Sequence, residues 1–226
     1  MVSWMTEQEK DTGPARPAVG ELNQQVGGRA QKAAARRAAI LAAALDEFSA
    51  RGFAAARLDD VARRADVAKG TIYLHFKDKE ALFQELVRTM LSPLVMTLEH
   101  LRASDVPIRV VLERFADLFV REIYGTRRRD VARLVITEGA RFPAIAEFYY
   151  REVVERGIAA MRAMIERAVG RGELSHAALA RFPQLVVAPG LVAILWVGLF
   201  DRFAHLDVAG MMRAHIEILL GPGSEP

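Results

Sequence analysis

Residues 58–76 read LDDVARRADVAKGTIYLHF, the pattern of two short helices joined by a tight turn. In the first half, apolar residues recur at the i, i+3, i+4, i+7 spacing that gathers side chains on one helix face, namely Leu58, Val61, Ala62 and Ala65. The second half has only Ile72 and Phe76 to bury. Because this second helix is short, polar outside and basic at both ends, its pattern favours insertion into the major groove of DNA.

Three residues near these helices carry local structural signals. Asp66 lies where the helices reverse direction, and such a turn favours the left-handed backbone that Gly, Asn and Asp adopt most readily. Gly70 opens the second helix, where the missing side chain and the helix N–H groups favour the approach of a phosphate. Asp78 precedes Lys79, Glu80 and an apolar pair, which is typical of a helix N-cap.

The outward face of this segment supplies the candidate DNA contacts. Thr71 is expected to read bases, and Tyr73 and Lys79 are expected to contact phosphates. Residues 29–90 carry 12 Lys and Arg against 8 Asp and Glu, whereas residues 91–226 carry 17 against 16. This local excess favours phosphate contacts, with a chance distribution of few lysines as the alternative. The predicted DNA-binding residues are Arg57, Lys69, Gly70, Thr71, Tyr73, Leu74, His75 and Lys79.

A wider pattern surrounds these positions between Arg36 and Leu82. It consists of Ile40-Leu41-Ala42-Ala43-Ala44, Phe48, Gly52-Phe53, Asp59-Asp60-Val61-Ala62, Val67, Lys69-Gly70-Thr71-Ile72-Tyr73, His75-Phe76 and Lys79-Glu80-Ala81-Leu82. This stretch resembles the TetR family of bacterial repressors. The resemblance implies a three-helix DNA-binding head, a larger all-helical body for ligand binding and dimerisation, and release of DNA when a small molecule fills the body.

The stretch departs from the family pattern at three places. Ala56-Arg57 stands where the family usually has a Thr-Ser or Thr-Thr pair, and Ala68 stands where it often has Ser. Both changes remove hydroxyls, and a capping hydroxyl contributes about 1 kcal/mol and also contacts phosphate. Arg57 offers a charged replacement for the lost phosphate contacts. Asp66 replaces the usual Gly, which keeps the left-handed option but adds a negative charge near the duplex.

Length and composition limit the organisation of the whole chain. With 226 residues, the chain holds a head of about 60 residues and one ordinary domain. The chain has no cysteine, which excludes disulfides and cysteine nucleophiles, and we predict a cytoplasmic location. In an all-α fold, we predict a flexible tail at 1–28, a helix-turn-helix domain at 29–80, a helical ligand-binding and dimerisation domain at 81–222, and a second tail at 223–226. The first tail does not suit a secretory leader, because its apolar residues are scattered among acids.

Periodicity and proline positions outline the helices outside the motif. Gly52 is the expected C-cap of the first helix. Pro93 is expected to bend a helix that connects head and body, and Pro107 is expected to take the first position of the next helix. The helices are expected over residues 30–50, 79–102, from 107 onward, 127–138 and 143–171.

The helix over 143–171 and its neighbours carry a wide apolar stripe with several aromatic rings. Such rings are more often ordinary core than ligand contacts. Because the TetR resemblance implies a cavity, we expect the rings to line a site for a small apolar or aromatic effector. The predicted ligand-binding residues are Phe115, Phe119, Tyr124, Phe142, Phe148, Tyr149, Met161 and Trp196.

Residues 182–200 contain no charged side chain over a length close to the thickness of a bilayer. Pro183 and Pro189 interrupt the segment and no basic cluster flanks it, so membrane association is the alternative rather than the expectation. A helix that is apolar on all sides is otherwise fully buried. We expect this segment and residues 208–220 to form a four-helix dimer interface, with two helices from each chain.

Sequence motifs of the common enzyme classes are absent. The chain has no Walker loop, no Gly-x-Ser-x-Gly and no dinucleotide-binding glycine pattern, so we predict no enzymatic activity, no cofactor and no metal site. The expected function is a ligand-responsive transcriptional repressor that binds a palindromic operator in double-stranded DNA as a homodimer and is released by its effector. A DNA-binding protein without a small-molecule effector is the alternative within the same class.

Overall fold

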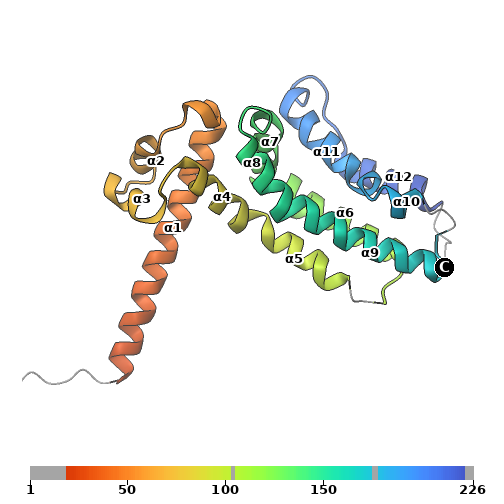
Figure 1. The fold of residues 1–226 in the computed structure, drawn as a ribbon, viewed down its shortest axis with the longest axis horizontal. Helices are drawn as coiled ribbons and strands as arrows, with labels where there is room; N and C mark the ends of the chain where they lie inside the picture. The colour runs from red at the N-terminus through yellow and green to blue at the C-terminus, as the bar shows by residue number, and fades with distance from the viewer. Residues whose placement is uncertain (1–18, 103–104, 175–177, 222–226) are drawn as a thin grey trace, which may run out of the picture. The chain divides into compact units, whose positions relative to one another are not determined.

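The computed structural model describes residues 19–102, 105–174 and 178–221. These residues form helices and turns without any strand, so the all-α prediction is confirmed (Figure 1). The chain divides into two compact units between Ala39 and Ile40. Residues 1–18 and 222–226, which include most of the two predicted tails, lie outside the described part of the chain.

The first helix, α1, spans Val19–Ala55 and begins earlier than expected. The predicted tail over 1–28 is therefore wrong from Val19 onward. The physical reason is that the chain has no proline between Pro17 and Pro93, and single glycines inside a helix cost only about 1 kcal/mol each. Gly52, with φ 72°, interrupts the helical geometry near the end of α1, as the predicted C-cap requires.

The helix-turn-helix consists of α2 (Leu58–Arg64) and α3 (Lys69–His75), which pack against each other. Between them, Asp66 has φ 51°, which confirms the predicted left-handed turn. The next helix, α4 (Lys79–Met90), begins at the predicted N-cap, where the N–H of Ala81 donates to Asp78 Oδ1 over 2.7 Å. The local signals read from the sequence thus place all three helices.

One hydrophobic core joins the helix-turn-helix to α1, α4 and two later helices, α7 (Arg128–Glu138) and α8 (Pro143–Tyr149). Its centre is an aromatic cluster of Phe48, Phe53 and Phe83, whose ring centroids lie 5.4–5.9 Å apart in tilted and edge-on arrangements. Ile72 of α3 is completely buried in this core. Apolar packing therefore fixes α3 to the rest of residues 40–221.

Pro93 divides the expected helix over 79–102 into two helices rather than bending one. The helical run of α4 ends before Leu91, and α5 (Ser92–Leu101) begins with Pro93 in its first turn. A proline lacks the N–H group that an interior position needs, whereas the first turn of a helix leaves its N–H groups unpaired in any case. Pro107 likewise lies at the N-cap of α6 (Ile108–Leu118), one position before its predicted place.

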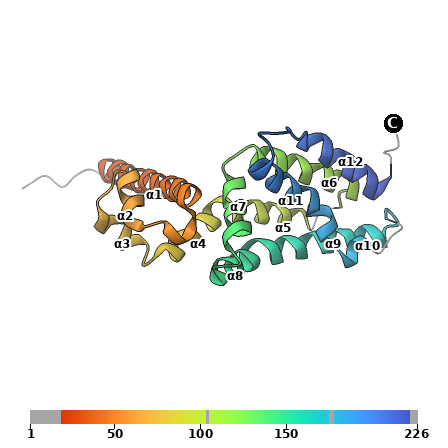
Figure 2. The same ribbon diagram turned by 90° about the horizontal axis from the view of Figure 1, so that it is seen from above.

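The remaining helices form a second core. The predicted helix over 143–171 is continuous but contains a π-helical turn, so it comprises α8, η2 (Tyr150–Glu155) and α9 (Arg156–Gly170). A second π-helical turn, η1 (Phe119–Tyr124), follows α6. Figure 2 shows α6 beside α12, in agreement with their contacts. The last helices are α10 (Ala178–Arg181), α11 (Gln184–Leu199) and α12 (Val208–Leu220).

Helix α11 is buried on only one side within a single chain, and its predicted place in a dimer interface stays a prediction. Its inner face, which includes Gly190, Ala193 and Ile194, is buried in the second core, but its outer face is exposed. The exposed apolar residues of α11 are Leu185, Leu191, Val192, Leu195 and Leu199. The neighbouring helices of a single chain cover only one side of a helix that is apolar all round. Among the described helices, α11 included, none is long and apolar enough to cross a membrane.

Candidate nucleic-acid interface

Helix α3 is anchored by one side chain and exposes most of the others. Ile72 has no exposed surface, and Phe76 directly after the helix is also buried. Lys69, Gly70, Tyr73, Leu74 and His75 are exposed, and Thr71 is half-buried. Leu74 is 84% exposed, which is unusual for a leucine and leaves it free to contact a partner. Six of the eight predicted DNA-binding residues therefore share this short helix.

An acidic residue of α2 holds the polar face of α3. The Lys69 ammonium donates to Asp59 Oδ2 over 2.7 Å, and the Tyr73 hydroxyl donates to Asp59 Oδ1 over 3.4 Å. The hydrogen bond from Lys69 is the main reason why the pKa of Asp59 lies below its usual range, and it raises the pKa of Lys69 in return. Both groups are therefore charged at neutral pH. One carboxylate thus connects the first residue of α3 with a ring one turn later.

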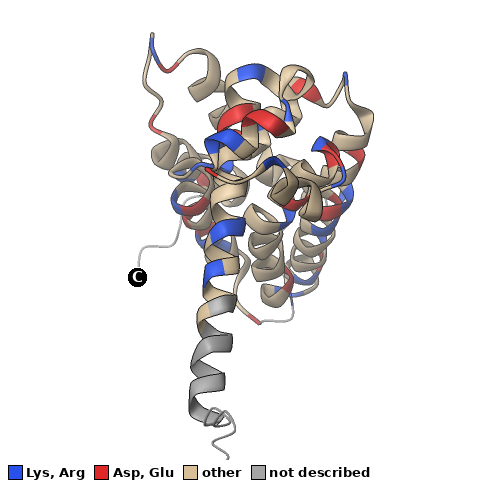
Figure 3. Cartoon of the chain, turned by 90° about the vertical axis from the view of Figure 1, so that its left-hand side faces the viewer, with Lys and Arg blue, Asp and Glu red and all other residues tan. Residues whose placement is uncertain are grey.

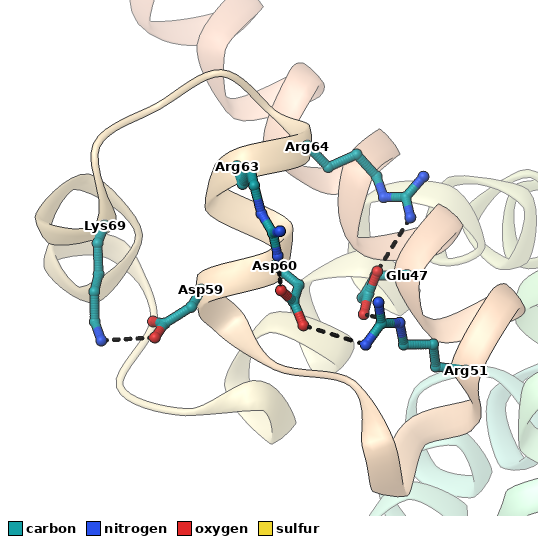
Figure 4. A network of polar contacts seen from close by, with 7 residues as sticks. All are labelled: Glu47, Arg51, Asp59, Asp60, Arg63, Arg64 and Lys69. Carbon is teal, nitrogen blue, oxygen red and sulfur yellow. Dashed lines mark hydrogen bonds and ion pairs between the residues drawn. The ribbon is translucent and has the colours of Figure 1, made fainter.

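A second ionic network fixes α2 to α1 (Figure 4). Glu47 of α1 is only 1% exposed, and its carboxylate accepts a hydrogen bond from Arg64 over 3.2 Å and pairs with Arg51 over 3.1 Å. Arg51 also lies 3.5 Å from Asp60, which pairs with Arg63. Since a buried carboxylate is strongly unfavourable without partners, this network holds α2 in one orientation.

A cleft of about 740 Å³ opens beside these helices. It lies where the end of α1, the start of α2 and one side of α3 meet, and its lining residues are Arg51, Ala54, Ala55, Ala56, Arg57, Leu58, Asp59, Tyr73 and Lys79. The Arg57 side chain is exposed and makes no hydrogen bond or ion pair with any other described residue, although its charge contributes to lowering the pKa of Asp59. The cleft thus combines a free guanidinium with a phenol, two groups that bind phosphate oxygens.

Lys79 has an internal role that the sequence does not reveal. Its ammonium donates to the carbonyl oxygens of Phe53 and Ala54 over 2.8 and 2.7 Å, and lies 4.9 Å from the centre of the Phe53 ring. These contacts tie the start of α4 to the end of α1 and satisfy carbonyls that the helix end leaves unpaired. Its predicted contact with phosphate stays a prediction.

Acidic and basic residues are interleaved over the described helices and are not sorted onto separate faces, as Figure 3 shows. Around α2 and α3, several of the basic side chains have acidic partners: Arg51, Arg63, Arg64, Lys69 and Lys77. Much of the positive charge of the helix-turn-helix is therefore paired within the protein. Arg57 is the exception within the cleft.

The eight predicted ligand-binding residues do not come together in one place. Phe142, Phe148 and Tyr149 pack against the first core, where burial raises the pKa of Tyr149 to about 12. Members of the second core are Phe115, Phe119, Tyr124 and Met161. Trp196 donates from Nε1 to the carbonyl of Ala204 over 2.7 Å.

A second cleft, of about 310 Å³, lies between α6 and α12 and contains none of the predicted ligand-binding residues. Its lining residues are Arg109, Glu113, Ala116, Asp117, Arg213, Ile216 and Glu217. Charged side chains therefore dominate this cleft, in contrast to the apolar site that the sequence predicts.

Sequence reasoning missed the contacts of two acidic residues in the candidate interface. Glu47 stands on the apolar face of α1 among buried Ala43, Ala44 and Phe48, and a charge on such a face is a recognisable signal of a buried ion pair. Asp59 gives no comparable signal, because an acidic residue in the first turn of a helix is ordinary. Its contact with Lys69 exists only once the turn at Asp66 has folded α3 back on α2.

Comparisons with known proteins agree with this geometry. Residues 40–86 match the family model of bacterial regulatory proteins of the tetR family, and residues 108–205 match the model of the tetracyclin repressor-like C-terminal domain. The HTH-type transcriptional regulator RutR of Escherichia coli (strain K12) is 36% identical over 87 residues, which cover 38% of this chain and 41% of RutR. The chain thus aligns with less than half of the length of RutR.

One further relative and one solved structure match most of the chain. The HTH-type transcriptional repressor KstR of Rhodococcus jostii (strain RHA1) is 32% identical over 194 residues, which cover 84% of each protein. The crystal structure of FadR from Bacillus subtilis, in complex with stearoyl-CoA, has the same fold, with a TM-score of 0.65 at 19% identity over 82% of this chain and 98% of that chain. The likeness to KstR and the two family models, together with the helix-turn-helix, show that this chain belongs to the TetR family of bacterial transcriptional regulators.

Proposed function

We propose that this protein is a ligand-responsive transcriptional repressor that binds a palindromic operator as a homodimer. The observation that carries the proposal is the state of α3: one buried side chain anchors it, and five of its other six residues are exposed. A rigid helix with an exposed polar face is what reading of base edges requires. We also propose that the protein works in the cytoplasm, where operators are located.

The DNA contacts divide into two classes in this proposal. Thr71, Leu74 and His75 face the base edges from α3, and Leu74 makes an apolar contact such as one with a thymine methyl group. Arg57 and Tyr73 take a backbone phosphate in the cleft of about 740 Å³. Arg57 thus replaces the hydroxyls that are missing from Ala56 and Ala68.

Dimerisation is proposed through α11 and α12. Large apolar side chains are exposed on α11, in the turn after it and on α12, and Ile218 of α12 is 80% exposed. Many exposed large apolar side chains on two neighbouring helices are typical of an interface. Two such faces related by a two-fold axis form a four-helix interface and present two copies of α3 to the two halves of a palindrome.

The effector is proposed to be apolar or aromatic. The FadR structure of similar fold holds stearoyl-CoA, and the body of this chain carries several aromatic rings that are partly buried against the two cores. Release requires that the effector bind the DNA-free conformation more tightly than the DNA-bound one. Since the predicted ligand-binding residues pack into two separate cores, regulation without an effector is the second candidate function.

Selection of operator fragments from random duplexes by the purified protein tests the proposal. We expect enrichment of a palindrome, and Thr71→Ala is expected to relax the preference at particular bases, whereas Tyr73→Ala weakens binding to all sequences about equally. A selected pool without any enriched sequence contradicts operator binding. Thermal shifts with fatty acids, acyl-CoAs and aromatic compounds then separate the two candidates, since a regulator without an effector shows no rise in melting temperature.

A further inference from the structure

We propose that Asp59 is an internal competitor of the DNA backbone, because its carboxylate holds the Lys69 ammonium in the free protein and has to release it to a phosphate when DNA binds. This inference rests on the proposed DNA-binding function and deepens it. Asp59 would limit the affinity for every duplex, specific or not, without contacting a base.

The geometry supports exchange of one acceptor for another. Asp59 Oδ2 accepts from Lys69 over 2.7 Å, a distance that a charge-assisted bond to a phosphate oxygen also has. Carboxylate and phosphodiester each carry one negative charge and accept the same bond. The Tyr73 hydroxyl, which lines the proposed phosphate cleft, donates to the same carboxylate over 3.4 Å. Asp59 thus occupies donors of two predicted DNA contacts at once.

Exposure separates this pair from the other ion pairs of the motif. The side chain of Asp59 is 47% exposed, against 15% for Asp60 and 1% for Glu47. Among the pairs of Glu47 and Asp60, those of Glu47 with Arg64 and of Asp60 with Arg51 connect α1 with α2. The Asp59–Lys69 pair is open to solvent, and exposed pairs of this kind are weak and readily exchanged. Because Lys69 lowers the pKa of Asp59, the competitor remains ionised at neutral pH.

The alternative role for Asp59 is to position Lys69 and Tyr73 for DNA, and the two roles have opposite consequences. As a positioning residue, Asp59 would strengthen binding, and its neutralisation would weaken it. As a competitor, Asp59 weakens binding, and its neutralisation frees a cation for phosphate. The sign of one measured change therefore distinguishes the two roles.

The experiment measures binding of full-length variants to a fluorescein-labelled duplex of mixed sequence by anisotropy, over a series of salt concentrations. Asp59→Asn is expected to bind about two- to fivefold more tightly than the natural protein at low salt, which is the range expected for the loss of an exposed ion pair. In a Lys69→Met background, the same substitution is expected to have little effect, because no ammonium remains to be released.

Asp66→Asn is the matched control for a general charge effect. Asp66 lies in the turn next to α3, its carboxylate makes no ion pair within the described residues, and asparagine tolerates its φ of 51°. Both substitutions remove one negative charge from the helix-turn-helix. Circular dichroism of each variant verifies that the fold is retained.

The outcomes separate the inference from the proposed function. If the natural protein does not bind the duplex at any salt concentration, the proposed DNA-binding function is wrong, and the proposed competition by Asp59 is then wrong as well. If the natural protein binds and Asp59→Asn binds equally or more weakly, only the inference is overturned. An equal gain for Asp66→Asn, or a gain that persists with Lys69→Met, overturns it as well, because the effect is then one of net charge.

Discussion

Gly52 has a backbone conformation that other residues adopt only with strain. Its φ and ψ are 72° and 166°, a region essentially restricted to glycine. A Cβ built on this residue would lie 2.8 Å from Glu138 Oε1, so the side chain of α7 fills the space that any substitution needs. The residue therefore combines a conformational and a steric requirement at the point where α1 ends.

We expect Gly52→Ala to lower the free energy of unfolding by about 1–3 kcal/mol or more, because strain and a close contact add up. Gly172→Ala is the matched control, since Gly172 has a similar φ of 74° but nothing within 4 Å of a built Cβ. Urea denaturation at one protein concentration measures the free energy of unfolding of both variants. Equal decreases in the free energy of unfolding of the two variants would show that the contact with Glu138 has no effect.

Lys79 is expected to contribute to stability independently of DNA. Lys79→Ala removes two hydrogen bonds to the end of α1, and each such bond contributes about 1 kcal/mol. Lys77→Ala is the control, because Lys77 is exposed and its only described contact is a loose pair with Asp78 at 3.8 Å. We expect a lower denaturation midpoint for Lys79→Ala than for the natural protein, and an unchanged midpoint for Lys77→Ala. An unchanged midpoint, together with weaker DNA binding, would return Lys79 to a role at the phosphates.

At the scale of elements, side chains from distant parts of the chain complete the helix ends. Pro107 supplies no capping side chain for α6, and the N–H of Ile108 instead donates to Glu173 Oε2 over 2.6 Å. Glu173 also pairs with Arg171. These bonds, first the one from Arg171 and then the one from Ile108, lower the pKa of Glu173 below its usual value of 4.5.

The lowered pKa predicts how Glu173 affects stability as the pH changes. A carboxyl group whose pKa is depressed by folding stabilises the protein fully above its ordinary pKa, and this contribution disappears as the pH falls through the folded pKa. Glu173→Gln is therefore expected to lower the stability by about 1 kcal/mol at pH 7. The difference from the natural protein should shrink below pH 4.5.

Denaturation midpoints of both proteins between pH 7 and pH 3 test this expectation. Glu166→Gln is the control, since Glu166 is exposed on α9 and has no hydrogen bond or ion pair among the described residues. A difference between Glu173→Gln and the natural protein that stays constant with pH would contradict the ionic role of Glu173.

Apolar periodicity in the sequence does not by itself predict where the helices are interrupted. The break at Leu91 follows from Pro93, which is visible in the sequence. The π-helical turns η1 and η2 carry no such signal, because their sequences FVREIY and YREVVE contain neither glycine nor proline. An extra residue per turn arises from the packing of the surrounding helices rather than from local preference.

At the scale of the molecule, the exposed apolar face of α11 and α12 predicts self-association. Leu195→Glu places a charge on this face and is expected to convert a dimer into monomers, because a buried, unpaired carboxylate is strongly unfavourable. Met96→Glu is the control, since Met96 of α5 is 49% exposed but lies outside this face. Light scattering coupled to size-exclusion chromatography gives the mass of each variant. A monomeric natural protein, or a dimeric Leu195→Glu variant, would exclude this interface.

The exposed face of α3, which carries most of the candidate DNA contacts, could be located from the chain alone, whereas the packing of the predicted ligand-binding residues could not. Positions 58–79 are organised by local rules: apolar spacing, a left-handed turn at Asp66 and an N-cap at Asp78. An effector site instead depends on whether rings from separate helices converge. Phe148 and Met161 both follow the expected helical stripe, yet they pack into different cores.

Local spacing and capping residues were sufficient to specify the two helices of the helix-turn-helix, the turn between them and the outward face of α3, because these depend on neighbours within a few residues. Pairing between distant side chains was not specified in this way. Arg64 with Glu47, Lys69 with Asp59 and Ile108 with Glu173 meet only after the helices have packed, since their separation along the chain is bridged by folding. Electrostatic compensation and burial depend on distances in space, and no one-dimensional pattern contains those distances.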